Sequence, residues 1–338
     1  MQTITNEITR DVLLCNPDGR LNPAARGWSR RPQHVCNLKG RFLRKKKWDY
    51  WCIMGDRFLF SATIAHVDFA ATGFIYLLEY ETGRLAEQVA FRLLPRKPIM
   101  PEMVGGKIRF EHGRLALAFL ETKTGMDMEV RSRRFGGKPL EAKLAIERPE
   151  THETLNVVVP WNERTFQFTS KQCCLPTTGT IAWGDEVLTF EPERAFATLD
   201  FGRGIWPYRT AWNWATFAGR AGPDVVGINM GAKWTDGTGM NENGIFLNGT
   251  MHKVFEDIVF EYDDTDFMKP WRMRTADSDA VDLHFEPFYE KPQRINLLLI
   301  ASRANQVFGR YHGAVRAGGR TIPIDNLLGW AEEHVARW

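Results

Sequence analysis

The sequence has no long hydrophobic run, and we expect no secretion signal. No stretch of 18 consecutive apolar residues occurs, which argues against a membrane-spanning helix. Residues 1–7 (MQTITNE) have neither the basic region nor the apolar core of a secretion signal. We therefore expect a cytoplasmic protein.

Cysteine is also scarce. There are five cysteines, an odd number, so they cannot all pair within one chain. Two of them, Cys173 and Cys174, are adjacent, and a disulfide between neighbours is strained. We expect reduced thiols, in agreement with a cytoplasmic location.

Several chemical signatures are missing as well. The formal net charge of +3 is too small to indicate a nucleic-acid partner. The chain has no Walker spacing, no G-x-S-x-G elbow and no EF-hand loop. His66-x-Asp68 and His284-x-Glu286 each place two ligand-type groups on one strand face, but neither has a third ligand at a recognisable spacing. We expect no metal and no dissociable cofactor.

Aromatic residues and short strands, in contrast, are abundant. Twelve tryptophans and 22 phenylalanines are more than a helical bundle needs. Residues 58–64 and 74–80 are rich in β-branched and aromatic residues and alternate as strands do. Asn248-Gly249 predicts a type I′ hairpin, and His112-Gly113 a second hairpin. Strands at this spacing, without alternating helices, indicate antiparallel barrels or sandwiches.

The length of 338 residues suits two such bodies. A charged strand gives way to a different composition near Arg148-Pro149-Glu150, so we expect domains at 1–149 and 150–338. One helix is predicted at the C-terminus. Asp325 is its expected cap, and its apolar stripe follows helical spacing through Leu328, Ala331, Val335 and Trp338.

Residues 198–214 (TLDFGRGIWPYRTAWNW) are the strongest indication of a site. This segment holds three tryptophans, a tyrosine, two arginines and an aspartate. Indole N–H groups and charges are costly to bury without partners. Such a segment usually lines a cleft, a ligand cavity or a group of buried ion pairs.

This segment, residues 231–243 (GAKWTDGTGMNEN), residues 306–311 (QVFGRY) and the closing residues 329–338 together resemble domain-of-unknown-function family 2804. The resemblance covers nearly the whole chain and implies a bacterial protein. More distantly, an aspartate shortly before a Trp-x-Trp element resembles the paired lipocalin-like barrels of carotenoid 1,2-hydratases and tocopherol cyclases. Those proteins act on or carry isoprenoid and lipid-like molecules. The family aspartate would fall on Asp200, next to Phe201 where the hydratases favour a histidine.

Asp200 is the candidate acid. Burial among tryptophans would raise its pKa, as protonation of an alkene requires, and aromatic faces could stabilise a developing cation. Pairing with Arg203 or Arg209 would instead lower the pKa of Asp200. The alternatives are a structural Asp–Arg pair that holds two strands together and a ligand-binding role without catalysis.

The other candidates are predicted to bind a ligand. Arg203, Tyr208 and Arg209 would orient its polar end, and Trp206, Trp212 and Trp214 would line its apolar part. A glycine-rich loop adds polar groups, with an ordinary tight turn as the alternative; its residues are Lys233, Asp236, Glu242 and Asn243. Arg310 lies on a late strand expected to return to the same cleft, or else makes an exposed cation–π contact.

The sequence thus predicts a mostly β protein with two tandem lipocalin-like antiparallel β-barrels or sandwiches and a C-terminal helix. It would bind, and as an enzyme transform, a lipophilic molecule by acid-catalysed hydration, cyclisation or isomerisation. The alternatives are a non-catalytic carrier and a structural or interaction protein. The basic run 41–47 would contact an anionic membrane surface if the ligand comes from a membrane, with a solvated face as the alternative. The sequence does not indicate an oligomeric state.

Overall fold

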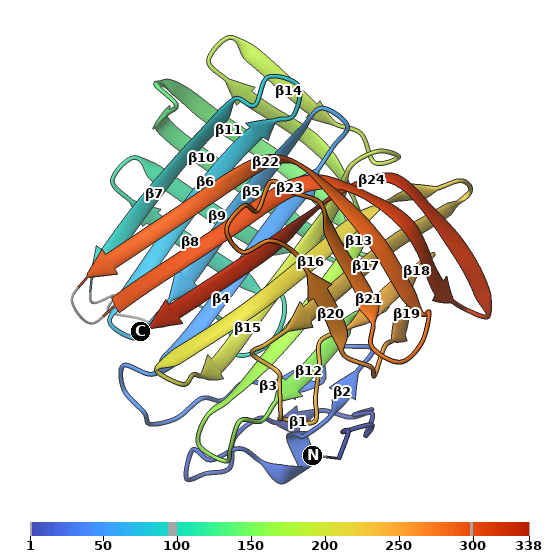
Figure 1. The fold of residues 1–338 in the computed structure, drawn as a ribbon. Coiled ribbons are helices and arrows are strands. Elements are labelled where there is room, and N and C mark those ends of the chain that lie inside the picture. Colours follow the sequence, from blue (N-terminus) through green and yellow to red (C-terminus); the bar gives the residue numbers. More distant parts are fainter. Residues whose placement is uncertain (1, 94–99, 298–299, 338) are drawn as a thin grey trace.

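The computed structural model describes residues 2–93, 100–297 and 300–337 (Figure 1). Within these ranges the chain is almost entirely β-strand. Its one helical element is a single 3₁₀ turn, η1 (Pro23–Ala25). No helix in the described part of the chain is long and apolar enough to cross a membrane.

The first sheet has 13 strands and curls into a nearly closed barrel. Its main path runs in the order β7-β6-β5-β4-β15-β13-β11-β10-β9-β8. Off this path, β12 and β14 pair with β13, and β2 pairs with β12. Its edge strands β7 and β8 come into contact. A separate two-stranded sheet joins β1 (Val12–Leu13) to β3 (His34–Val35). The strands of the barrel are β2 (Trp28–Ser29), β4 (Lys45–Met54), β5 (Phe58–His66), β6 (Ala70–Glu79), β7 (Leu85–Leu93), β8 (Lys107–His112), β9 (Leu115–Glu121), β10 (Gly125–Phe135), β11 (Lys138–Glu147), β12 (Leu155–Val159), β13 (Phe166–Trp183), β14 (Glu186–Phe190) and β15 (Phe196–Ile205).

The second sheet has nine antiparallel strands and forms a half-barrel. Their order is β19-β18-β17-β16-β24-β23-β22-β21-β20. Its concave side holds a core of its own around Phe217, Trp271, Phe285 and Tyr311. The strands are β16 (Arg209–Ala221), β17 (Asp224–Ala232), β18 (Gly244–Leu247), β19 (Thr250–Lys253), β20 (Ile258–Glu261), β21 (Trp271–Thr275), β22 (Val281–Leu297), β23 (Ile300–Ala317) and β24 (Arg320–Arg337).

The two sheets pack against each other through a third apolar layer, which we call the inter-sheet layer. In Figure 1 the orange and red strands β22 to β24 cross in front of the blue strands β4 to β6. Rings from both sheets meet there. The ring centres of Tyr50 and Trp214 are 5.7 Å apart, and those of Tyr76 and Phe308 are 6.2 Å apart. Alternation along each strand therefore gives β4, β15 and β13 one face toward the barrel core and one toward the second sheet.

The mostly β fold with two barrel-like bodies is confirmed, and so are both hairpins. Asn248 and Gly249 have φ values of 51° and 85° between β18 and β19, as a type I′ turn requires. Gly113, with φ of 62°, connects β8 to β9. All five cysteines are buried and unpaired.

The predicted C-terminal helix is wrong, because residues 320–337 form strand β24. This strand pairs with β16 on one side and β23 on the other, and both of its faces are buried over residues 329–333. Trp330 faces the inter-sheet layer, while the adjacent Ala331 faces the concave core. Two buried faces produce apolar runs that happen to match helical spacing. The expected cap, Asp325, instead contacts His312 Nδ1 through its carboxylate at 3.1 Å.

The chain passes from the first sheet to the second at residues 206–208, between β15 and β16. The strands that follow residue 150, β12 to β15, still belong to the first sheet. A division into folding domains at 149/150 stays a prediction.

Candidate functional site

A row of polar side chains crosses three neighbouring strands of the barrel. Lys171 on β13 is opposite Asp200 on β15, and Asp200 is opposite Tyr50 on β4. Directly opposed residues share a face. Tyr50 belongs to the inter-sheet layer, so the whole row faces the second sheet.

Lys171 bridges two carboxylates from different sheets. Its Nζ lies 3.0 Å from Asp200 Oδ1 and 3.1 Å from Oε2 of Glu242, which precedes β18. The same ammonium group lies 4.5 Å from the ring centre of Trp214. Burial acts to lower the pKa of Lys171, but attraction to Asp200 and Glu242 outweighs it and the pKa is raised. Lys171 therefore stays charged.

Asp200 is the most exposed member of this cluster. Its side chain is 13% exposed, against 5% for Lys171 and 2% for Glu242. Besides Lys171, the Trp48 indole donates to Oδ2 at 3.1 Å and the Thr169 hydroxyl donates to Oδ1 at 3.1 Å. These three contacts hold the carboxyl group in place. Asp200 is thus the member best placed to touch a bound molecule.

Glu242 lies behind Lys171 and is held by Trp234, whose indole donates to Oε1 at 2.8 Å. Burial raises the pKa of Glu242, Lys171 acts to lower it, and the nearby charge of Asp200 adds to the rise. A Cβ on Gly231 would lie 2.2 Å from Glu242 Oε1, so only glycine fits beside this carboxyl group. The cluster thus brings two carboxyl groups to one buried ammonium group.

Tryptophans pack densely beside the cluster. Trp206 stacks on Trp234, with ring centres 5.6 Å apart and planes 4° apart. Trp48, Trp161 and Trp212 meet the Trp206 ring edge-on or nearly so. Trp206 and Trp234 are buried, whereas these three rings are partly exposed. The buried indoles therefore contact one another, and the partly exposed ones offer surface to a ligand.

Trp214 and Trp212 are held by hydrogen bonds within the second sheet. The Trp214 indole donates to Asn229 Oδ1 at 2.8 Å, and its ring meets those of Tyr50 and Trp330 edge-on. The Trp212 indole donates to Glu332 Oε1 at 3.0 Å. The centres of the Trp212 and His334 rings are 3.9 Å apart.

A second polar group lies in the same layer. The hydroxyl groups of Tyr50 and Tyr76 are 2.7 Å apart, Tyr76 donates to Gln306 Oε1 at 3.1 Å, and Gln306 Nε2 donates back to Tyr50 at 3.2 Å. The three groups form a closed ring of hydrogen bonds that joins the barrel to β23. Burial raises the pKa of both tyrosines well above the usual value, so both stay neutral.

Neither arginine suggested as a partner of Asp200 pairs with it. Arg203 is fully buried on the opposite face of β15, where its guanidinium group lies 2.7 Å from Asp49 Oδ1. Arg209 starts β16 and lines a separate pocket. Tyr208 is 40% exposed beside Arg44, and Arg310 donates to the Asn326 carbonyl at the surface.

The glycine-rich loop is mainly a tight turn, the alternative raised for it. The Lys233 amide donates to Asp236 Oδ1 at 3.0 Å, and Lys233 has a φ of 71°. Asn243 Oδ1 accepts the Gly231 amide at 2.8 Å. Of the four loop residues proposed as ligand contacts, only Glu242 joins the cluster at Asp200.

Several site residues were missed by sequence reasoning. Residues 166–175 of β13 are all buried, and Lys171 is the one charged residue among them. That isolated charge was the available signal. Trp48 follows the basic run 41–47, in which Lys45 to Lys47 begin β4 and Phe42 is 69% exposed. The described residues contain no group of three His, Cys, Asp or Glu side chains that could hold a metal ion.

The sequence matches the family described as "Domain of unknown function (DUF2804)" over residues 5–338, and the chain belongs to this family. The resemblance found in the sequence is thereby confirmed, while a bacterial origin stays a prediction. No curated protein matches the sequence.

Three solved structures illustrate the fold likeness. CghA with Sch210972 is 12% identical with a TM-score of 0.50, over 87% of this chain and 88% of that chain. Kievitone hydratase from Nectria haematococca is 10% identical with a TM-score of 0.44, over 86% of this chain and 88% of that one. A putative AttH from Nitrosomonas europaea is 10% identical with a TM-score of 0.47, over 86% and 92%. At these identities the likeness concerns the fold alone.

Proposed function

We propose that this DUF2804 protein binds a lipophilic small molecule at the inter-sheet layer and transforms it by proton transfer, as a hydratase, cyclase or isomerase. The observation that carries the proposal is the ammonium group of Lys171 between Asp200 and Glu242, next to partly exposed tryptophans. Buried titratable groups that share a charge are typical of acid–base sites. Trp48 provides apolar surface beside Asp200, and Trp212 packs against the same Trp206 ring as Trp48 does.

Asp200 is the group that exchanges a proton with the ligand, because it is the exposed end of the cluster. In a hydration, the Asp200 proton moves to one carbon of a double bond and the oxygen of a water molecule bonds to the other carbon. One proton of that water then returns to Asp200, so the residue is regenerated. The neighbouring indole faces stabilise positive charge on the intermediate.

The acid role requires a proton on Asp200 when the ligand binds. Lys171, Trp48 and Thr169 hold this carboxyl group through three contacts. Glu242 contacts the same ammonium group, and its pKa is raised by burial and by the nearby charge of Asp200, while Lys171 acts to lower it. Lys171 and Glu242 are then positioning residues for proton transfer.

A structural role for the layer is the second candidate. Trp206 and Trp214 are only 4% and 6% exposed, and their indole groups already have partners in Gln167 and Asn229. In that case the rings join the two sheets and bind nothing. A carrier without catalysis would use the same exposed rings as the enzyme. Contact with an anionic membrane and a cytoplasmic location stay predictions.

Native mass spectrometry of the full chain, followed by solvent extraction, tests the proposal. A stoichiometric apolar adduct is expected in the wild type. The adduct should be weakened by Trp212→Ala and unaffected by Tyr208→Ala, which changes an exposed ring outside the layer. If the protein carries no adduct and also fails to bind added isoprenoid alcohols, the proposed binding is wrong and the structural role is favoured.

A further inference from the structure

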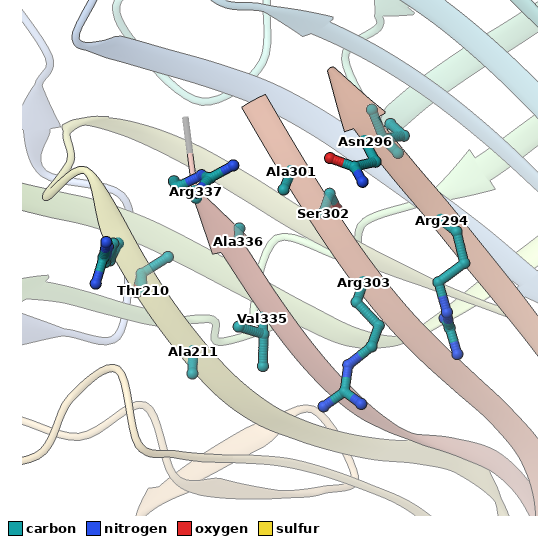
Figure 2. A pocket seen from close by; sticks show the side chains of 12 residues that line it. Thr210, Ala211, Arg294, Asn296, Ala301, Ser302, Arg303, Val335, Ala336 and Arg337 are labelled. Carbon is teal, nitrogen blue, oxygen red and sulfur yellow. The ribbon is translucent and has the colours of Figure 1, made fainter. Parts of the chain in front are cut away.

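A hollow lies apart from the inter-sheet layer, at one end of the half-barrel (Figure 2). It has a volume of about 830 Å³, within the range of roughly 300–1,000 Å³ that ligand pockets occupy. Its walls come from the start of β16, the end of β22, the start of β23 and the end of β24. These strand ends lie near the C-terminus in Figure 1.

Strand register places most of the lining on one face. Ala211, Val335, Arg303 and Arg294 form one cross-strand row, and the next row towards the strand ends holds Arg209, Arg337, Ala301 and Asn296. By alternation these rows share the face of Phe217 and Ala331, which carries the concave core. Figure 2 shows the Arg294 and Arg303 side chains extending to the same side of their strands. The hollow is thus the open end of the half-barrel, a usual place for a ligand.

The charge of this pocket is strongly one-sided. Four of its twelve lining residues are arginines and none is acidic. The Glu333 carboxylate, which contacts the lining residue Arg303, binds two cations: Arg303 Nη2 lies 2.9 Å from Oε1 and Lys233 Nζ lies 3.3 Å from Oε2. Arg294 donates to Asn305 Oδ1 at 2.5 Å and to the Ala304 carbonyl at 2.7 Å, both neutral acceptors. Arg303 therefore shares its carboxylate with Lys233, and these side-chain contacts of Arg294 are with neutral acceptors.

Apolar surface accompanies this charge. Val335 and Ile295 line the pocket and are each 42% exposed, and Ala211 and Ala336 extend the wall. Guanidinium groups bind carboxylates and phosphates in two-pronged fashion, and exposed aliphatic groups favour an apolar neighbour. The combination fits a molecule with an anionic head and an aliphatic part.

We propose that this pocket binds the anionic head group, carboxylate or phosphate, of an aliphatic amphiphile. The guanidinium groups hold the head, and the aliphatic part lies along Val335 and Ala211. The site differs in kind from the cluster at Lys171, where two carboxyl groups share one cation and an anion would be repelled. The binding does not depend on the proton chemistry proposed for Asp200.

Titration of the full chain with dodecanoate below its micelle concentration, followed by calorimetry, tests this site. We expect one binding site whose affinity falls about tenfold in Arg209→Gln and further in Val335→Asp, since each removes a favourable head or chain contact. Arg310→Gln, an exposed arginine of β23 outside the pocket, is the matched control and should bind as the wild type does. The uncharged methyl ester should bind more weakly than the acid.

The source of the head group is settled by a parallel arm with vesicles. Binding of free dodecanoate or dodecyl phosphate means a soluble amphiphile, whereas binding only to phosphatidylglycerol vesicles, lost in Arg209→Gln, means a lipid head group. The proposal is overturned if neither arm shows binding, or if both pocket variants bind as well as wild type. The titration is repeated in Asp200→Asn, where unchanged affinity separates this site from the inter-sheet layer.

Discussion

Lys171 and Glu242 pair across the two sheets, with 3.1 Å between Nζ and Oε2. Lys171 comes from the barrel strand β13, and Glu242 comes from the segment that leads into β18 of the half-barrel. Their side chains are only 5% and 2% exposed. Because the pair is buried between the sheets, substitutions that change its charge should alter the stability of the protein. The cluster can therefore be tested by mutation.

Loss of the cation should be more harmful than loss of the whole pair. Lys171→Met leaves Asp200 and Glu242 without their shared cation and with only neutral donors, and we expect it to lower the free energy of unfolding by about 3–5 kcal/mol. Adding Glu242→Gln to that variant should restore part of the loss, because one of the two unpaired charges is removed. Denaturant unfolding of the single and double variants measures this coupling. A double variant less stable than Lys171→Met would contradict it.

Gly231 should be indispensable for the position of Glu242. Gly231→Ala would place a Cβ 2.2 Å from Glu242 Oε1 and displace the carboxyl group from the Trp234 indole. We expect a loss of about 1–3 kcal/mol, as for other overpacked sites. Gly219→Ala is the control, because its Cβ would meet only the end of the Leu327 side chain, at 3.0 Å. Equal melting temperatures for the two variants would refute the close fit.

Acid stability should depend on His34. Its ring is buried next to the Ala25 carbonyl, and burial lowers its pKa from 6.5 to about 4. Between these two values the unfolded state binds the additional proton, so the free energy of unfolding falls as the pH drops from 6.5 to 4. The full effect is on the order of 3 kcal/mol.

Urea unfolding across this pH range measures the dependence on His34. In His34→Gln the fall in the free energy of unfolding between pH 6.5 and pH 4 should be smaller by that amount. An unchanged slope in His34→Gln would show that another group titrates.

Turnover and binding should separate at Asp200. Asp200→Asn keeps the shape of the side chain but removes the exchangeable carboxyl proton, so a bound ligand should be retained and its conversion lost by about 10²–10⁴-fold. Mass analysis of the ligand recovered from each variant provides the measurement. Asp282→Asn, an exposed carboxylate on β22, is the matched control. Full conversion in Asp200→Asn would remove this residue from the mechanism.

Local features of the sequence predicted the strands and turns well. Asn248-Gly249 marks its hairpin because few other residues accept positive φ at two successive positions. The C-terminal segment was misread because residues 329–333 of β24 are buried on both faces, and burial on both faces removes the alternation that identifies a strand. That information lies in the packing of two sheets and not in the segment itself.

The site was predicted only in part, for a similar reason. Asp200 and Arg203 are three positions apart, so a regular strand places them on opposite faces, and this could have excluded their pairing from the sequence. Arg203 does hold two strands together, but its partner is Asp49 on β4. Lys171 meets Asp200 through the register of β13 with β15, and Glu242 arrives from the other sheet. Such long-range contacts follow from topology, which a single sequence does not reveal.

Photo-crosslinking with a diazirine-bearing isoprenoid alcohol tests most directly whether a lipophilic molecule binds between the two sheets near Lys171. Digestion and mass spectrometry of the full chain locate the attachment. Our account predicts adducts on the peptides that carry Trp48 and Trp212, reduced by competing unlabelled alcohol. Adducts spread over the outer surface, with none on these two peptides, would contradict it.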